Sequence, residues 1–215
     1  MAKTIKIESP KILSELKTAN FNDIFYEEEP ELFNCEITNS QVDNEVINRA
    51  VFSKVIFKNI TFINSTFLNI DMTDVVFDHC NLSNTCLSEG IIHRVEFKNC
   101  KLLGLDVSKA SLGNVVFRNC DLKLSNFSDT RLKQIGFEES SLRSANFFEA
   151  KLDKVQLNRC DLNDVDFTQT ILKGIDISTC TYEQINVSPE SLRGCEVSSN
   201  QAIGFSKLLG LKIKE

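Results

Sequence analysis

Every fifth residue of this chain is apolar or aromatic over most of its length. The series begins at Leu32 and ends at Val197, and all 34 of its positions follow the rule. Since 42% of the whole chain is hydrophobic, a random sequence would contain such a run with odds on the order of 10⁻¹³. Neither an α-helix, with 3.6 residues per turn, nor a flat strand, with a repeat of two, has this period. The chain must therefore fold as a repeat array.

A longer repeat of twenty residues contains four of these fives. Residues twenty apart are of one type, as in Val55, Val75 and Val95, which lie two positions before a centre. The centres separate in the same way. One column holds Phe57, Phe77, Phe97, Phe117 and Phe137, and another holds Leu82, Leu102, Leu122, Leu142 and Leu162. We expect these ten side chains to form the structural core.

The two periods predict an all-β fold, a right-handed quadrilateral β-helix of about eight coils. Each side is five residues long, and residues twenty apart stack at the strand spacing of ~4.8 Å. The centre and the residue two before it point inward, and the other three residues meet water. Backbone groups pair with the coils above and below, as in other solenoids.

Three segments follow from the extent of the repeat. Residues 32–197 form the β-helix, and residues 1–31 are expected to cover its first coil as a cap or hairpin, because an open solenoid end is an aggregation template. Residues 198–215 hold a short helix over about Asn200–Leu209, capped by Ser198 or Ser199 and stopped by Gly210. An apolar tail follows the helix.

Composition narrows the function classes. The N-terminus lacks the apolar region of a signal peptide, and no stretch approaches the ~18 apolar residues of a membrane span. We therefore expect a cytoplasmic protein with no membrane contact, whose eight cysteines are free thiols. The formal net charge of −6 argues against direct nucleic-acid binding, because the attraction to phosphates would have the wrong sign.

The cysteines and histidines do not predict a catalytic or metal site. Five of the cysteines share one inward column: Cys80, Cys100, Cys120, Cys160 and Cys180. Stacked parallel thiols do not converge as a tetrahedral zinc site requires, so we interpret them as small core residues. The two histidines, His79 and His93, lie outward, and no nucleophile–base set or phosphate loop is present. The sequence predicts no enzyme, no cofactor and no metal.

Charge is segregated by side. One side carries five acids against Lys109, and these acids are Glu89, Asp106, Asp129, Glu149 and Asp166. The next side carries eight cations against four acids. About one acid per coil would be ~4.8 Å from the next, compared with 3.4 Å between phosphates on one DNA strand. The acidic side is therefore either a DNA-like stripe for a basic partner or an ordinary solvated face.

The repeat resembles the pentapeptide-repeat family, whose consensus is A(D/N)LXX. The stretches CDLKLSNFSD, SANFFEAKLDK and CDLNDVDFTQ match this consensus residue by residue. The resemblance covers about three-quarters of the chain and implies the four-sided β-helix. A fold alone does not give a function.

The C-terminal end is similar to that of the Qnr-type quinolone-resistance proteins, which also end in a short helix with a Leu-Gly-x-x-Ile-like tail. The unbroken register leaves no room for the loops that interrupt the coils in several Qnr proteins. The resemblance implies a homodimer joined at the C-termini, a DNA mimic that binds DNA gyrase or topoisomerase IV and protects it from quinolones. The residues implied in the dimer interface are Phe205, Leu208, Leu209, Leu211 and Ile213.

A second hypothesis remains open. Many pentapeptide-repeat proteins have no known role, and this chain could be a structural or scaffolding protein that binds another protein partner. The identity of the partner recovered from a host lysate would separate the two hypotheses.

Overall fold

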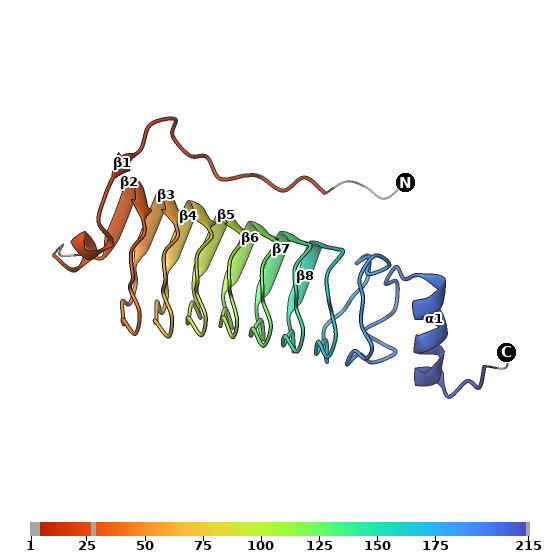
Figure 1. Ribbon diagram of the computed structural model, residues 1–215. Coiled ribbons are helices and arrows are strands. Elements are labelled where there is room, and N and C mark those ends of the chain that lie inside the picture. The colour runs from red at the N-terminus through yellow and green to blue at the C-terminus, as the bar shows by residue number, and fades with distance from the viewer. Residues whose placement is uncertain (1–4, 27–28, 214–215) are drawn as a thin grey trace.

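The computed structural model describes residues 5–26 and 29–213, and it is a rod of stacked coils (Figure 1). Seven strands of eight residues lie on one flank of the rod. They are β2 (Glu31–Thr38), β3 (Val51–Lys58), β4 (Asp71–Asp78), β5 (Ile91–Lys98), β6 (Ser111–Arg118), β7 (Arg131–Glu138) and β8 (Lys151–Asn158). Each pairs in parallel with the next, and partners such as Val75 and Val95 are twenty residues apart. The predicted right-handed quadrilateral β-helix is confirmed, with strands in seven coils where about eight coils were predicted.

Each coil has four walls, which we name after the central residues of the coil that contains residues 50–69. Every strand covers two of them, the Phe52 wall and the Phe57 wall. The Phe62 wall and the Phe67 wall are joined from coil to coil by isolated parallel bridges, such as Thr61 to Asn81 and Thr66 to Cys86. The twenty-residue register therefore holds on all four walls.

The corners between walls are made by residues in the left-handed helical region. The second residue after every centre from Leu32 to Phe167 has a positive φ, for example 53° at Asn59 and 57° at Asn64. Asparagine tolerates this region better than other side chains because its amide can hydrogen-bond locally. The Asn59 amide also donates to the Asn39 side chain one coil earlier, at 3.2 Å. These corners explain how the chain turns repeatedly with only 3 prolines and 8 glycines.

The core is a set of stacked columns. The Phe97 ring lies 4.8 Å from the Phe77 ring and 5.0 Å from the Phe117 ring between centroids, and the rings are nearly parallel. All ten predicted core residues are buried, as are the inward valines and five of the inward cysteines. Each layer therefore fills the same cross-section as the layer before it.

The N-terminal segment has two parts. The 3-10 helix η1 (Phe21–Phe25) closes the first coil, where the Phe21 ring lies 5.3 Å from the Phe62 ring. Before it, β1 (Lys17–Thr18) pairs in parallel with Cys35 and Glu36 of β2. Within the described part of residues 1–31, η1 and this parallel pairing of β1 lie at the first coil, where a cap or hairpin was expected.

Residues 5–16 form an extended arm that runs along the rod, across the strands (Figure 1). Side chains from the coils hold its backbone: the Glu8 amide donates to Asn114, and the Lys11 amide donates to Asp74. The Asp74 carboxylate is buried and also receives two hydrogen bonds from Arg94, at 2.6 and 2.9 Å. The Arg94 guanidinium holds the pKa of this carboxyl below its usual value.

The C-terminal end is helical. Helix α1 (Ser199–Phe205) begins with a capping box between Ser198 and Gln201, and the 3-10 helix η2 (Ser206–Leu209) continues it to Gly210, whose φ is 70°. The predicted cap and stop are both confirmed. The Gln201 amide donates to the carbonyls of Ile177 and Cys180, so the helix is anchored on the last coils. None of the helices among the described residues is long and apolar enough to cross a membrane.

Removing one ring from the stack tests the column. We expect Phe117→Ala to lower the free energy of unfolding by about 3–5 kcal/mol, because a buried ring leaves a cavity between two rigid layers. Urea denaturation of this variant and of Lys101→Ala, an exposed control, measures the difference. An equally small effect in both variants would contradict the stacking.

Acid should release the arm. Because the pKa of Asp74 is lowered in the folded state, its contribution is present above the ordinary carboxyl pKa of ~3.9 and is lost as the pH falls through the folded value. We expect the Lys11 amide to lose protection from hydrogen exchange in that range, and Asp74→Ala to speed its exchange about tenfold or more at neutral pH. Asp71→Ala is the control. Unchanged Lys11 exchange in Asp74→Ala would show that this carboxylate does not hold the arm.

Candidate interaction surfaces

The five predicted acids all lie on the Phe67 wall, one on each of five consecutive coils. They do not form a single line, because they occupy the two edges of the wall. Asp106 and Asp166 stand one residue before a centre, in the bridges that join coils. Glu89, Asp129 and Glu149 stand two residues after a centre, at corners with φ between 55° and 60°. The acids therefore lie along both edges of the wall, and Asp129 and Glu149 follow one another on the same edge.

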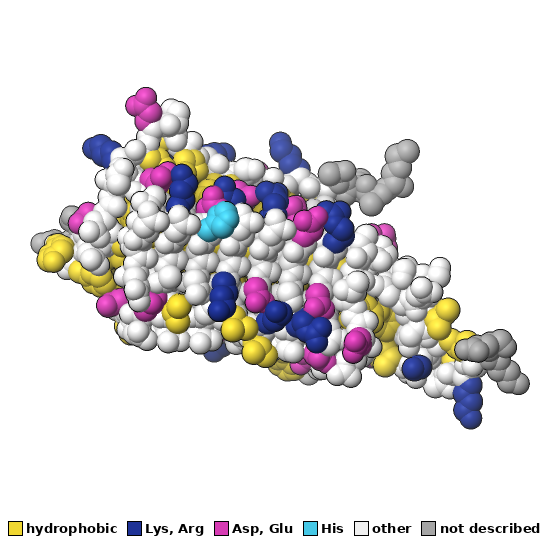
Figure 2. Space-filling model, viewed as in Figure 1, with side chains coloured by type: hydrophobic (Ala, Val, Ile, Leu, Met, Phe, Trp, Pro, Cys, Tyr) yellow, Lys and Arg dark blue, Asp and Glu magenta, His cyan; other side chains and the backbone are white. Residues whose placement is uncertain are grey.

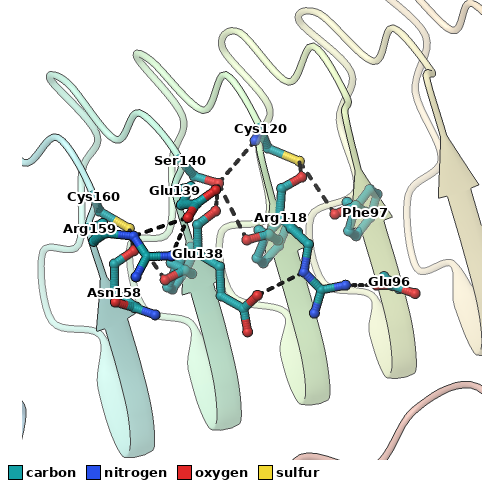
Figure 3. Close-up of polar contacts among 12 residues, drawn as sticks. Glu96, Phe97, Arg118, Cys120, Glu138, Glu139, Ser140, Asn158, Arg159 and Cys160 are labelled. Atoms are coloured by element: carbon teal, nitrogen blue, oxygen red, sulfur yellow. Dashed lines mark hydrogen bonds and ion pairs between the residues drawn. The ribbon is translucent and has the colours of Figure 1, made fainter.

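None of the ion pairs between described residues includes any of these five acids. On the Phe57 wall, by contrast, Arg118 bridges Glu96 and Glu138, at 2.7 and 2.8 Å, and Arg159 pairs with Glu139 (Figure 3). Figure 2 shows a face of the rod on which charges of both signs lie side by side. The Phe67 wall thus presents its negative charge to the solvent.

Two of the acids have a second, local role. The Asp106 carboxylate accepts a hydrogen bond from the Ser108 amide at 2.9 Å, and Asp166 accepts one from the Thr168 amide at 2.8 Å. Asn126 and Asn146 make the same contact in the coils between them. Because an uncharged amide oxygen makes the same contact, the contact does not depend on the charge of Asp106 or Asp166.

The Phe67 wall meets the Phe52 wall of the following coil at a corner of the rod. A shallow groove at this corner is lined by Asp129 and Glu149 of the Phe67 wall and by Arg131, Lys151 and Lys173 of the Phe52 wall. The predicted segregation of charge by wall is therefore present, and the boundary between the two signs runs along a corner of the rod.

The C-terminal end exposes apolar side chains. Leu208, Leu209, Leu211 and Ile213 are 44%, 68%, 58% and 55% exposed, and hydrophobic side chains gather at this end of the molecule (Figure 2). Phe205 is half-buried and its ring lies 5.8 Å from that of Tyr182. The structure thus brings together the residues implied in a dimer interface, at the end of the rod.

The inward cysteines form a ladder of thiol–carbonyl contacts. The Cys100 and Cys120 sulfurs lie 3.5 and 3.4 Å from the carbonyl oxygens of Phe77 and Phe97, and Cys160 repeats the contact in a later coil (Figure 3). A hydrogen bond with the Cys120 thiol, followed by burial, raises the pKa of Cys100 to about 12. Within residues 5–26 and 29–213, no His, Cys, Asp and Glu side chains gather into a group that could hold a metal ion.

Two features of these surfaces were missed by the sequence reasoning. The left-handed corners could have been found from the asparagines that recur every fifth residue, as at Asn59, Asn64 and Asn69. The ion pairs could have been found from opposite charges twenty apart, such as Arg118 and Glu138. Both signals become visible only when the register is applied to the outward residues.

Comparison with known proteins finds a similar repeat in the middle of the chain. A family model described as "Pentapeptide repeat region" matches residues 70–147 and 90–167. A search of curated proteins found no match.

Two solved structures illustrate the likeness. HetL, a pentapeptide repeat protein involved in heterocyst differentiation regulation from the cyanobacterium Nostoc sp. strain PCC 7120, is 17% identical with a TM-score of 0.52, over 78% of this chain and 83% of that chain. Trypsin-treated QnrB1, a plasmid-mediated fluoroquinolone resistance protein, is 16% identical with a TM-score of 0.45, over 86% of this chain and 99% of that chain. At this identity, the likeness to HetL shows the fold alone.

The local role of Asp106 can be separated from its charge. We expect Asp106→Asn to change the free energy of unfolding by less than about 0.5 kcal/mol, because the amide oxygen can still accept from Ser108, as Asn126 does from Ser128. Asp106→Ala should lower it by about 0.5–1.5 kcal/mol. Urea denaturation measures both variants. Equal destabilisation by Asn and Ala would mean that the coil requires the charge.

Proposed function

We propose that this chain, a pentapeptide-repeat β-helix, is a DNA mimic that binds DNA gyrase or topoisomerase IV and protects it from quinolones. The proposal uses the outer walls of the rod, because its interior is filled with side chains. It also requires that the protein share a compartment with the topoisomerase, and the cytoplasmic location expected from the sequence would meet this requirement.

The observation that carries the proposal is the row of unpaired acids on the Phe67 wall. A surface that binds DNA carries lysine and arginine side chains placed to meet phosphates. Acids on five successive coils offer such a surface about one negative charge per ~4.8 Å of rod, compared with one per 3.4 Å of helix axis on one DNA strand. Carboxylates that are already paired within the rod would lose their ion pairs when they bind a partner. The acids of the Phe67 wall have no ion pair among the described residues to lose.

The charge is suited to guiding the approach of the two proteins. Exposed charges mostly raise the association rate and set orientation, and salt screens them over about 8–10 Å at ordinary ionic strength. We therefore expect binding to weaken as salt is added. The basic Phe52 wall next to the stripe would discourage docking with the rod rotated by one wall.

The C-terminal tail supports a two-fold dimer in this proposal. The side chains of Leu208, Leu209 and Leu211 are exposed at the rod end, and a self-complementary contact through such apolar side chains gives a closed dimer. Two rods joined end to end would double the length of the acidic stripe. The resemblance of this helix and tail to the Qnr-type C-terminus, noted from the sequence, points to the same arrangement.

A supercoiling assay with DNA gyrase and ciprofloxacin tests the function. We expect the wild-type protein to restore supercoiling, and the variant Glu89→Gln, Asp106→Asn, Asp129→Asn, Glu149→Gln, Asp166→Asn to lose most of that effect, since the favourable field at the basic surface is removed. The matched control neutralises five acids of the other walls that make no ion pair among the described residues: Asp43, Asp71, Asp153, Asp176 and Glu183.

The control carries the same net charge as the test variant, so it should protect nearly as well as the wild type. The idea fails if wild-type protein, shown by sedimentation to be dimeric, never restores activity of gyrase or topoisomerase IV at any concentration. If both variants lose protection equally, net charge and not the Phe67 wall would be responsible. Recovery of an unrelated protein from a host lysate would then favour the scaffolding hypothesis.

A further inference from the structure

The strand ladder of the rod stops at β8, although the coils continue. β8 pairs with β7 on one side, and it is the last strand of the sheet. Among the described residues, no bridge or backbone hydrogen bond joins Lys151–Asn158 to residues 171–178 of the following coil. The other walls stay joined at this level, through the bridges of Asp161 to Thr181 and Asp166 to Asn186. The rod therefore opens on two walls only.

The open edge is best seen by comparison with the next coil. In that coil the amides of Leu172, Gly174 and Ile177 donate to carbonyls of the coil that follows, at 2.8–2.9 Å. The equivalent amides of β8 belong to Leu152, Lys154 and Leu157. The twenty-residue register directs them at the following coil, where no carbonyl among the described residues accepts from them.

A hollow lies along this edge. β8 lines one side of it, residues 173–176 line the other, and Ile5 of the arm borders it. Leu152 is half-buried here, whereas the same column position is almost completely buried in neighbouring coils, at 1% exposed for Leu132 and 0% for Leu172. The hollow thus offers both unpaired strand groups and an accessible core leucine.

The charge around the hollow limits what can occupy it. Four carboxylates line it, those of Glu138, Asp153, Asp176 and Glu196, against the two lysines Lys154 and Lys173, and Glu138 is also paired with Arg118. A second copy of the same edge would bring the same excess of carboxylates, so self-pairing is disfavoured. A basic segment would be attracted.

We propose that the open edge of β8 is a docking site for an extended, basic segment of a partner protein, which adds as a strand beside β8. In this mode the main chain of the peptide supplies carbonyls to the free amides, and alternate side chains meet the pockets of the edge. An apolar residue of the segment contacts Leu152, and its basic residues face the carboxylates. Proteins normally protect such an edge, which makes an uncovered one a candidate for recognition. The site lies on different walls from the acidic stripe, so this proposal does not depend on the proposed function and is tested separately from it.

The test uses the full chain and a fluorescein-labelled peptide of three Lys-Val repeats, with a Glu-Val peptide of equal length as control. We expect only the Lys-Val peptide to raise the fluorescence polarisation. Its binding should also slow hydrogen exchange at the amides of Leu152, Lys154 and Leu157. Asp153→Lys combined with Asp176→Lys should weaken binding roughly tenfold. Asp43→Lys combined with Asp71→Lys, which makes the same charge change away from the hollow, should not.

Several results would overturn the proposal. If the peptide binds but leaves the three amides unprotected, its binding reflects general attraction to acidic residues. The same conclusion follows if both pairs of substitutions weaken binding equally. Failure of the Lys-Val peptide to bind would also reject it. If the three amides become free to exchange only after residues 1–4 are deleted, the chain's own N-terminus is the occupant, and no partner segment is needed.

Discussion

The stacking of residues twenty apart is the contact on which the rest of the molecule depends. A single coil cannot bury its inward side chains or pair its backbone, so its stability comes from its neighbours. Phe97 between Phe77 and Phe117 illustrates the contact: three buried rings of one kind, nearly parallel and about one strand spacing apart. Because the spacing between backbones sets the spacing between rings, the column and the ladder of hydrogen bonds require the same register. A shift of one residue would break both.

The same register organises the surface. Outward residues twenty apart are also neighbours, so a charge on one coil meets the charge at the same position on the next. On the Phe57 wall several of these neighbours have opposite signs and neutralise one another, as Arg118 does with Glu138 and Lys98 does with Asp78. On the Phe67 wall the acids are divided between two edges, so most successive acids are further apart than one strand spacing and repel one another less. The rod therefore keeps an acidic wall without pairing it internally.

The sequence predicted the coils better than it predicted what lies outside them. The columns of Phe117 and Leu122 could be assigned because inward residues must repeat to fill identical layers. The arm could not be predicted, because it crosses the coils and contacts them through isolated side chains such as Asp74 and Asn114. The opening beside β8 could not be predicted from the five-residue pattern, because Leu172, Ile175 and Ile177 of the next coil are apolar and buried as the pattern requires. Periodicity reports which side chains point inward, and it does not report whether neighbouring backbones are bonded.

The spacing along one column tests this account most directly. A crystal structure would measure the distances between the Cα atoms of Phe77, Phe97, Phe117 and Phe137 without reference to any function. We expect successive distances of ~4.8 Å, with all four rings on one wall and facing the same interior. Rings distributed over different walls, or successive residues of the column separated by much more than one strand spacing, would contradict the register and with it every surface described above.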